Sequence, residues 1–288
     1  MSWANRPLGR LRTLRAVDET GQGPRAYYAA TYDVSVSNWP GEIDFYLRAA
    51  QAVAPAEVLE LAVGTGRVAA HLASAGLIVT GIDRSPEMLA VARGKTAGLP
   101  KLRLVEADMR SFDLGRRFGL VIIPGHSFQH LLTADDQLAC LREIRRHLDR
   151  TGRVIVHVDH QDTDWLGAIS PGGRLAGVFE PAESFRHPTT GRQVKTARAW
   201  TYRRVDQTAV VTTVWQEVAD DGSVVAPVQL GPTPIHCVFH HEMEHLLGRA
   251  GFEVEHLFGD FLGNPLTDES TEMIWQAHAA SLEGRHER

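Results

Sequence analysis

The sequence predicts an α/β protein with a mostly parallel sheet, helices on both faces of that sheet, and an antiparallel β insert. Two patterns predict this class. Between residues 58 and 158, short apolar runs alternate with helical patterns, which is typical of a parallel sheet covered by helices. After residue 160 the pattern changes to alternating apolar and polar residues, which is typical of antiparallel strands.

The composition indicates a globular protein. Of the 288 residues, 43% are hydrophobic and 23% are charged, so neither disorder nor a coiled coil is expected. The chain contains no apolar run of about eighteen residues, and its start lacks the apolar region of a secretory signal. The two cysteines, Cys140 and Cys237, are too few for a disulfide framework. These observations together predict a cytoplasmic protein.

The net charge of −5 argues against nucleic acid as the main partner, because phosphate-rich ligands require a surplus of cations. We therefore expect a small-molecule partner and neither nucleic acid nor membrane.

Three parts of the chain are expected. Residues 1–25 hold five arginines and few apolar residues, and are expected to form a mobile N-terminal arm. Residues 26–160 and 241–288 are expected to form the core domain, and residues 161–240 the antiparallel insert. No linker-like stretch separates two independent cores, so one elaborated domain is expected.

The core elements follow in order. A helix is expected to open at Pro40 and run through Ala52. Further helices are expected from near Gly66 to Gly76, from Ser85 as N-cap, and from Thr133. Five parallel strands are expected at residues 58–61, 77–82, 102–105, 120–123 and 154–158.

The insert and the C-terminal part complete the prediction. Alternation at 197–202 and 210–218, and the hairpin signal Asp221-Gly222 before 224–225, predict three or four antiparallel strands. A helix at 241–250 and strands at 252–257 and 272–277 complete a seven-stranded main sheet.

The segment 58–67 (VLELAVGTGR) carries the strongest chemical signal. It leaves a buried strand, turns on two glycines and enters a helix, so the backbone can approach a ligand closely. Asp83 ends the next strand, where a carboxylate can accept hydrogen bonds from the two hydroxyls of a ribose. A third small residue, typical of dinucleotide sites, is missing because Arg67 stands there. A nucleoside-containing ligand is therefore expected.

The segment resembles the E/D-x-G-x-G-x-G motif of class I S-adenosylmethionine-dependent methyltransferases, with Glu60 as the acidic residue and Ala62 in place of the first glycine. Segments at 107–109, 124–127 and 246–252 match the family in order after the third strand, after the fourth and before the sixth. The resemblance extends over roughly residues 27–277 and implies the Rossmann-like methyltransferase fold with S-adenosylmethionine as cofactor.

The resemblance also implies which residues bind the cofactor. The loop from Ala62 to Gly66 would wrap its methionine part, Asp83 would bind the ribose, and Asp108 the adenine amine. Tyr32 is the expected contact from a lid. The full set implied is Tyr32, Glu60, Ala62, Gly64, Gly66, Asp83, Arg84, Met88, Asp108, Met109 and Pro124.

Histidine is the expected general base if the acceptor needs one. His126, directly after the fourth strand, is the first candidate, with His130 as its neighbour; the alternative is that His126 only orders its loop. His157, Asp159 and His160 form a second polar group, for which lining the acceptor pocket is favoured over holding a metal, so no metal is expected.

A literal H-E-x-x-H sequence at 241–245 matches the zinc-protease signature. Its two histidines are expected on the wet side of a helix whose other side is apolar, so it is interpreted as a surface feature.

The expected function is methyl transfer from S-adenosylmethionine to nitrogen or oxygen of a small molecule, in secondary metabolism. Similar antiparallel inserts occur in the sugar N-methyltransferases that the family includes. The alternatives are an enzyme of the same fold that cyclises or isomerises its substrate without methylation, and a non-catalytic binding module. The insert's edge strand offers a second role, pairing two copies into a homodimer.

Overall fold

The computed structural model describes residues 23–36, 39–219 and 221–280. These residues divide into two compact units. One unit contains residues 39–161 and 237–280, and the other contains residues 24–36 with residues 162–236. No helix in the described part of the chain is both long enough and apolar enough to cross a membrane. Most of the expected N-terminal arm lies outside the described residues.

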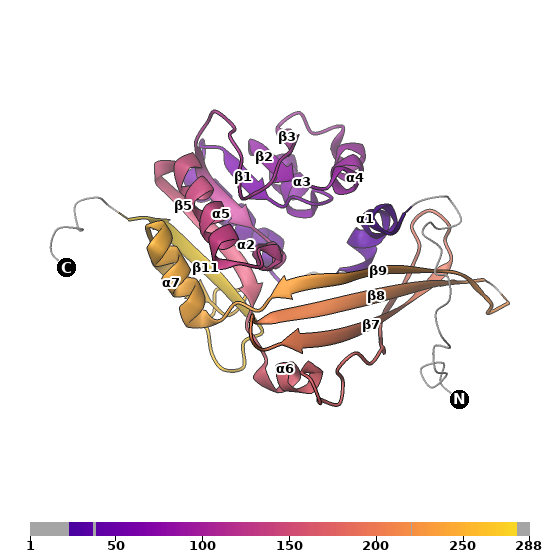
Figure 1. Ribbon diagram of the computed structural model, residues 1–288. Helices are drawn as coiled ribbons and strands as arrows, with labels where there is room; N and C mark the ends of the chain where they lie inside the picture. Colours follow the sequence, from indigo (N-terminus) through magenta and orange to yellow (C-terminus); the bar gives the residue numbers. More distant parts are fainter. Residues whose placement is uncertain (1–22, 37–38, 220, 281–288) are drawn as a thin grey trace. The chain divides into compact units, whose positions relative to one another are not determined.

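The first unit is a seven-stranded sheet with the strand order β10-β11-β5-β4-β1-β2-β3 (Figure 1). Its strands are β1 (Val58–Leu61), β2 (Val79–Asp83), β3 (Leu102–Glu106), β4 (Phe118–Ile123), β5 (Leu148–Asp159), β10 (Phe252–Phe258) and β11 (Glu272–Ala279). The first five are parallel to one another, while β11 pairs antiparallel with both β5 and β10. The expected seven-stranded, mostly parallel sheet is confirmed.

Helices cover both faces of this sheet. They are α2 (Glu42–Val53), α3 (Arg67–Ser74), α4 (Pro86–Thr96), α5 (Ala134–His147) and α7 (His240–Ala250). One apolar core joins α5 and α7 to one face of the sheet, where these two helices lie side by side in Figure 1, and the other core joins α2, α3 and α4 to the opposite face. Strand residues alternate between the cores, since Leu59 packs in the first and Val58 in the second.

The expected caps are confirmed at two helices. The side chain of Ser85 accepts a hydrogen bond from the backbone N–H of Met88 at the start of α4, where Pro86 is the first helical residue. The Thr133 side chain accepts the corresponding bond from Asp136 at the start of α5. These caps satisfy N–H groups that have no partner within the helix.

Several expected boundaries differ: β2 begins at Val79 rather than at residue 77, β4 begins at Phe118 rather than at residue 120, and β9 (Val224–His236) extends to His236. The helix expected from Pro40 begins instead at Glu42, because Gly41 takes a left-handed conformation (φ +80°) that ends the preceding turn. Strand β5 begins at Leu148 rather than at residue 154 and pairs there with Phe118. The charged residues between Leu148 and Val154 hid this part of the strand from the hydrophobic pattern.

The second unit is a four-stranded antiparallel sheet with the order β6-β7-β8-β9, as expected for the insert. Its elements are α1 (Pro24–Ser35), α6 (Thr163–Ile169), β6 (Glu180–Arg186), β7 (Gln193–Arg203), β8 (Thr208–Val218) and β9 (Val224–His236).

Helix α1 belongs to this second unit, whereas the sequence placed residues from 26 onward with the core. Tyr27 is buried, stacks against Trp215 of β8 at 5.6 Å, and donates a hydrogen bond to Glu217 of the same strand at 3.3 Å. A helix of this length shows which face is apolar but not which sheet will cover that face, so the sequence could not assign it.

Candidate functional site

The loop between β1 and α3 has the backbone conformation of a tight ligand-binding turn. Ala62, Gly64 and Gly66 all have positive φ, at 54°, 55° and 78°. Ala62 therefore has a left-handed conformation that glycine adopts freely and that costs an alanine about 1–2 kcal/mol. Gly66 is the N-cap of α3, so the free N–H groups of that helix begin at the loop.

Asp83, at the end of β2, is joined to this loop. Its Oδ2 accepts a hydrogen bond from the Gly64 backbone N–H at 2.8 Å, and its Oδ1 accepts one from the Ser85 N–H at 2.8 Å. The glycine turn and the downstream aspartate thus converge, as the sequence predicted. Each carboxylate oxygen has a second acceptor position, which suits the two hydroxyls of a ribose.

Gly81 of β2 explains how strand and loop come so close. A Cβ at this position would lie 2.6 Å from Cγ2 of Val63, the residue in the middle of the loop. Only glycine fits beneath the loop without moving it. The sequence analysis did not identify this residue, because a glycine within a strand pattern gives no sign of what approaches it.

Glu60 lies just before the loop and is buried, with 3% of its surface exposed. Its Oε2 has no hydrogen-bond partner. Desolvation raises the pKa of Glu60 to about 8, although the nearby Arg67 opposes this shift. Arg67 itself makes a two-pronged ion pair with Glu42 of α2, with N···O distances of 2.5 and 2.8 Å. A buried acidic oxygen without a partner, beside the loop, fits the ammonium group of an amino-acid ligand such as the methionine end of S-adenosylmethionine.

The expected adenine side lies at the ends of β2 and β3, where the backbone N–H of Ala107 bonds to the carbonyl of Asp83 at 3.0 Å. The Asp108 carboxylate is bound by Arg110 at 2.7 and 3.0 Å, and these hydrogen bonds lower the pKa of Asp108. Asp108 is thus firmly ionised but already carries one strong partner, which the sequence did not reveal. Arg84 is exposed and Met88 and Met109 are half-buried at this edge.

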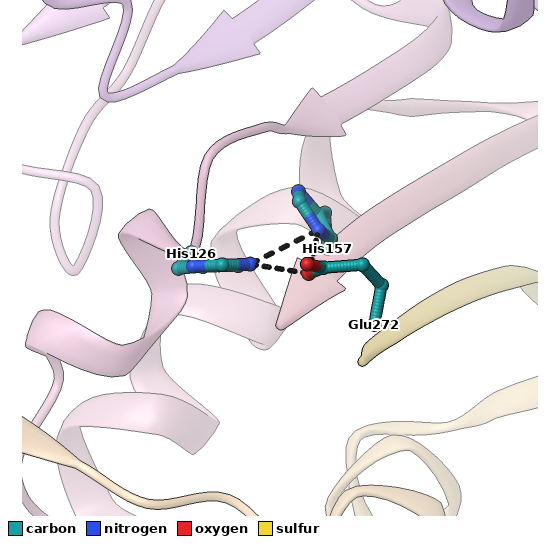
Figure 2. Close-up of side chains that lie close together, drawn as sticks. All are labelled: His126, His157 and Glu272. Atoms are coloured by element: carbon teal, nitrogen blue, oxygen red, sulfur yellow. Dashed lines mark hydrogen bonds and ion pairs between the residues drawn. The ribbon is translucent and has the colours of Figure 1, made fainter. Parts of the chain in front are cut away.

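A second polar group lies at the ends of β4 and β5. We call it the His126 cluster and define it as Trp39, His126, His157, Asp159 and Glu272. Figure 2 shows the Glu272 carboxylate facing both imidazole rings. Its Oε2 lies 2.6 Å from His126 Nε2 and 2.7 Å from His157 Nε2, while its Oε1 accepts a hydrogen bond from Trp39 Nε1 at 2.8 Å. The antiparallel register of β11 on β5 pairs Glu272 with Asp159, which brings both carboxylates to this edge.

The geometry requires His126 to be doubly protonated. Nδ1 of His126 lies 2.9 Å from Asp159 Oδ1, so both of its ring nitrogens face carboxylate oxygens. A neutral imidazole has one N–H and can donate to only one of them. Although desolvation opposes the charge, the hydrogen bonds to Asp159 and Glu272 raise the pKa of His126 to about 9. At neutral pH His126 is therefore a cation, which argues against the expected role of general base.

Of the other two buried members, Glu272 is ionised and His157 is neutral. Desolvation acts against ionisation of Glu272, but hydrogen bonds from the two histidine rings lower its pKa to about 2. His157 is completely buried, and desolvation lowers its pKa. The Gly125 backbone N–H donates to His157 Nδ1 at 3.2 Å, so the ring proton of neutral His157 lies on Nε2 and points to Glu272.

The His126 cluster also contains ligand types suited to a metal, since two imidazole nitrogens and a carboxylate oxygen converge. A metal on Nε2 of His157 would place the ring proton on Nδ1, where the Gly125 N–H already points. The hydrogen bond from Gly125 to His157 Nδ1 therefore suits a neutral ring that carries its proton on Nε2, and it does not suit a metal bound to Nε2. His160 points away from His157 and Asp159, as expected from the alternation of side chains along a strand, with its Nδ1 2.8 Å from the carbonyl of Ser270.

The remaining predicted residues are placed as follows. Pro124 is buried at the end of β4, and His130 is exposed at the end of the 3₁₀ helix η2 (Ser127–His130). Tyr32 lies in α1 in the other unit, where its ring stacks edge-on against Tyr28 at 5.5 Å. Within the H-E-x-x-H segment, His241 and His245 are exposed on α7, as expected.

Sequence reasoning missed Trp39 and Glu272 as site residues. Glu272 lies 146 positions from His126, and no local pattern relates them. The sequence does contain one signal: Glu272 is a charged residue at the start of a strand, and the next three residues are apolar. A carboxylate that is buried at such a position needs hydrogen-bond partners, so Glu272 could have been named as a candidate site residue.

Comparisons with known proteins identify relatives of this chain and of its fold. Residues 58–152 match the family model of the methyltransferase domain. A dTDP-3-amino-3,6-dideoxy-α-D-glucopyranose N,N-dimethyltransferase from Streptomyces fradiae is 35% identical over 171 residues, which are 55% of this chain and 63% of that protein. Two of the curated relatives are matched over 53% and 63% of their own lengths, so the chain spans only about half to two thirds of them.

Solved structures match more of the chain. The CcbJ methyltransferase from Streptomyces caelestis superposes with a TM-score of 0.69 at 24% identity, covering 89% of this chain and 98% of that one. CalS10, an amino pentose methyltransferase from Micromonospora echinaspora solved with S-adenosylmethionine bound, gives a TM-score of 0.65 at 22% identity, covering 88% of this chain and 96% of that one. Residues 58–152 therefore match a methyltransferase domain, and the chain has the fold of the class I methyltransferases. The fold that the motifs implied is confirmed.

Proposed function

We propose that the protein transfers a methyl group from S-adenosylmethionine to an amine nitrogen of a small molecule. The observation that carries this proposal is the convergence of the loop Ala62–Gly66 with the Asp83 carboxylate at the carboxyl ends of β1 and β2. The strand order changes direction beside β1, which is the usual ligand position in such sheets.

The cofactor, when bound, supplies an electrophilic methyl group on its sulfonium. This chain's residues then have three tasks. The loop and Asp83 would hold the nucleoside and methionine parts, and Glu60 would face the ammonium group. The protein supplies no covalent nucleophile, so positioning and exclusion of water are its main contributions.

The His126 cluster favours an amine over a phenol or alcohol. A phenol or alcohol acceptor gains from a base that removes its proton, and His126 is already protonated by its two carboxylate partners. A neutral amine needs no such base, because it attacks with its lone pair and loses its proton afterwards. Asp159, Glu272 and His126 together carry one negative charge, which suits the positive charge that forms on the nitrogen.

The names of the similar proteins support the same acceptor class. One relative methylates the amino group of a nucleotide-linked sugar, and one structural neighbour is an amino pentose methyltransferase. An amino sugar is therefore the first acceptor to test.

The test is an incubation of the full chain with S-adenosylmethionine and dTDP-3-amino-3,6-dideoxy-α-D-glucopyranose, beside a panel of simpler primary amines and the matching alcohols. Mass spectrometry should show an amine product heavier by one methyl group, with equimolar S-adenosylhomocysteine. A product without the methyl group would indicate a cyclising or isomerising enzyme of the same fold. Cofactor binding without turnover of any amine or alcohol would contradict the proposed activity.

A further inference from the structure

We propose that Glu272 is a positioning residue of the methyl-transfer site, which fixes His126 as a doubly protonated hydrogen-bond donor and so keeps it from acting as the general base. This inference rests on the proposed function for its role in the reaction. The geometry of the ring and its partners does not depend on that function.

His126 is held at the edge of the sheet by a sharp turn of the backbone. It follows β4 directly and has a left-handed backbone conformation (φ +62°), rare for a residue other than glycine. Gly125 before it is also left-handed (φ +63°). The chain thus makes a sharp turn that directs the imidazole to the end of β5, where Asp159 and the start of β11 lie. His126 retains 23% side-chain exposure, so it stays accessible at the edge of the sheet.

Glu272 is itself held by other groups. Trp39 Nε1 donates to one of its oxygens at 2.8 Å, and His157 Nε2 donates to the other at 2.7 Å. The His157 ring is fixed in turn by the Gly125 N–H and by edge-on packing against Trp39 at 4.9 Å between ring centres. Glu272 therefore has one orientation and presents a buried negative charge to His126.

The groups around His126 set its charge. The charged or titratable groups that face it are Asp159 at the end of β5, His157 within β5, and Glu272 at the start of β11. The cation Arg67 lies over the Trp39 ring, 5.7 Å from its centre, and is paired with Glu42. Two carboxylates and one neutral ring surround His126, so its imidazolium form is favoured.

In this state His126 cannot take a proton from the acceptor. Both N–H groups of His126 point to carboxylates, so neither ring nitrogen has a lone pair for the proton of an acceptor. Of the two carboxylates, Glu272 is the better shielded from solvent, with 11% side-chain exposure against 44% for Asp159. The hydrogen bond to Asp159 raises the pKa of His126 the most and that to Glu272 comes next, while the field of the more buried Glu272 is the less screened by water.

The experiment is a pH titration of the histidine ring nitrogens by NMR, on the ¹⁵N-labelled full chain with and without S-adenosylhomocysteine. The ring-nitrogen signals that are missing from the spectrum of His126→Gln are assigned to His126. In the wild-type protein both nitrogens of His126 should have the shifts of an imidazolium at pH 7.5. In Glu272→Gln the proton affinity of His126 should fall at least tenfold. Glu269→Gln, an exposed glutamate in the loop before β11, is the matched control and should leave the titration unchanged.

Three outcomes would overturn the proposal. One is a His126 ring that is neutral at pH 7.5 in the wild-type protein, which needs no variant to fold. Another is a Glu272→Gln protein in which His126 titrates as before. The third is a shift of both His126 and His157 Nε2 signals on addition of equimolar Zn²⁺, which would identify the cluster as a metal site. None of these readouts requires methyl transfer, so the failure of this inference is distinguishable from the failure of the proposed function.

Discussion

Replacing Glu60 with glutamine tests the most unusual electrostatic feature of the cofactor site. Glu60 is almost fully buried beside the loop, and its Oε2 has no partner. Desolvation raises its pKa from 4.5 to about 8 in the folded protein. The folded state therefore binds more protons than the unfolded state between those two values.

The direction in which stability changes with pH follows from the difference in bound protons between the folded and unfolded states. Where the folded state holds the extra proton, stability falls as the pH rises. One proton corresponds to a slope of up to about 1.4 kcal/mol per pH unit, and this slope applies between pH 4.5 and about 8. Glutamine has nearly the same shape and never ionises, so Glu60→Gln removes this slope. The variant should match the wild-type protein near pH 4.5 and be the more stable by on the order of 5 kcal/mol at pH 8.5.

The assay is urea unfolding followed by circular dichroism at pH 5, 6.5 and 8.5, with Glu253→Gln on the exposed surface of β10 as the control. Binding adds a second readout. Calorimetry of S-adenosylhomocysteine at pH 7 in two buffers of different ionisation enthalpy should show the release of nearly one proton, and Glu60→Gln should show none. Equal pH slopes of stability in the wild-type and Glu60→Gln proteins would refute the reasoning.

Two further predictions concern the loop itself. Ala62→Gly should raise the free energy of unfolding by about 1 kcal/mol, because glycine takes φ +54° without the clash that alanine meets; thermal unfolding that shows a lower stability would contradict this. Gly81→Ala should lower the stability by about 1–3 kcal/mol and weaken S-adenosylhomocysteine binding, because its new Cβ would meet Val63 at 2.6 Å and displace the loop; unchanged affinity in calorimetry would show that the loop does not need this close approach.

The part of the fold that the sequence predicted is the part encoded by local patterns. The strand at 58–61, the caps Ser85 and Thr133, and the hairpin at Asp221-Gly222 each depend on a few neighbouring residues, and the structure has them where expected. The glycine loop and Asp83 could be predicted to meet because the carboxyl ends of adjacent parallel strands share one edge of the sheet.

The parts that were missed depend on pairing across long distances in the sequence. Glu272 reaches His126 only through the antiparallel register of β11 on β5, and Trp39 reaches it from the segment before α2. The charge of His126 could not be inferred either, because it depends on carboxylates from two different strands. Nor could the packing of helix α1 with the antiparallel sheet be inferred, since its amphipathic pattern does not specify the sheet on which it packs.

The central claim is that the loop Ala62–Gly66 and Asp83 together bind the adenosyl cofactor, and titration calorimetry with S-adenosylhomocysteine tests it most directly. The wild-type protein should bind one equivalent. Asp83→Asn should bind about 10- to 150-fold more weakly, because the ribose hydroxyls and the Gly64 N–H lose a charged acceptor worth about 1.5–3 kcal/mol. Asp268→Asn, an exposed aspartate in the loop before β11, should bind as the wild-type protein does. The absence of binding to the wild-type protein, or equal affinity in Asp83→Asn, would contradict the claim.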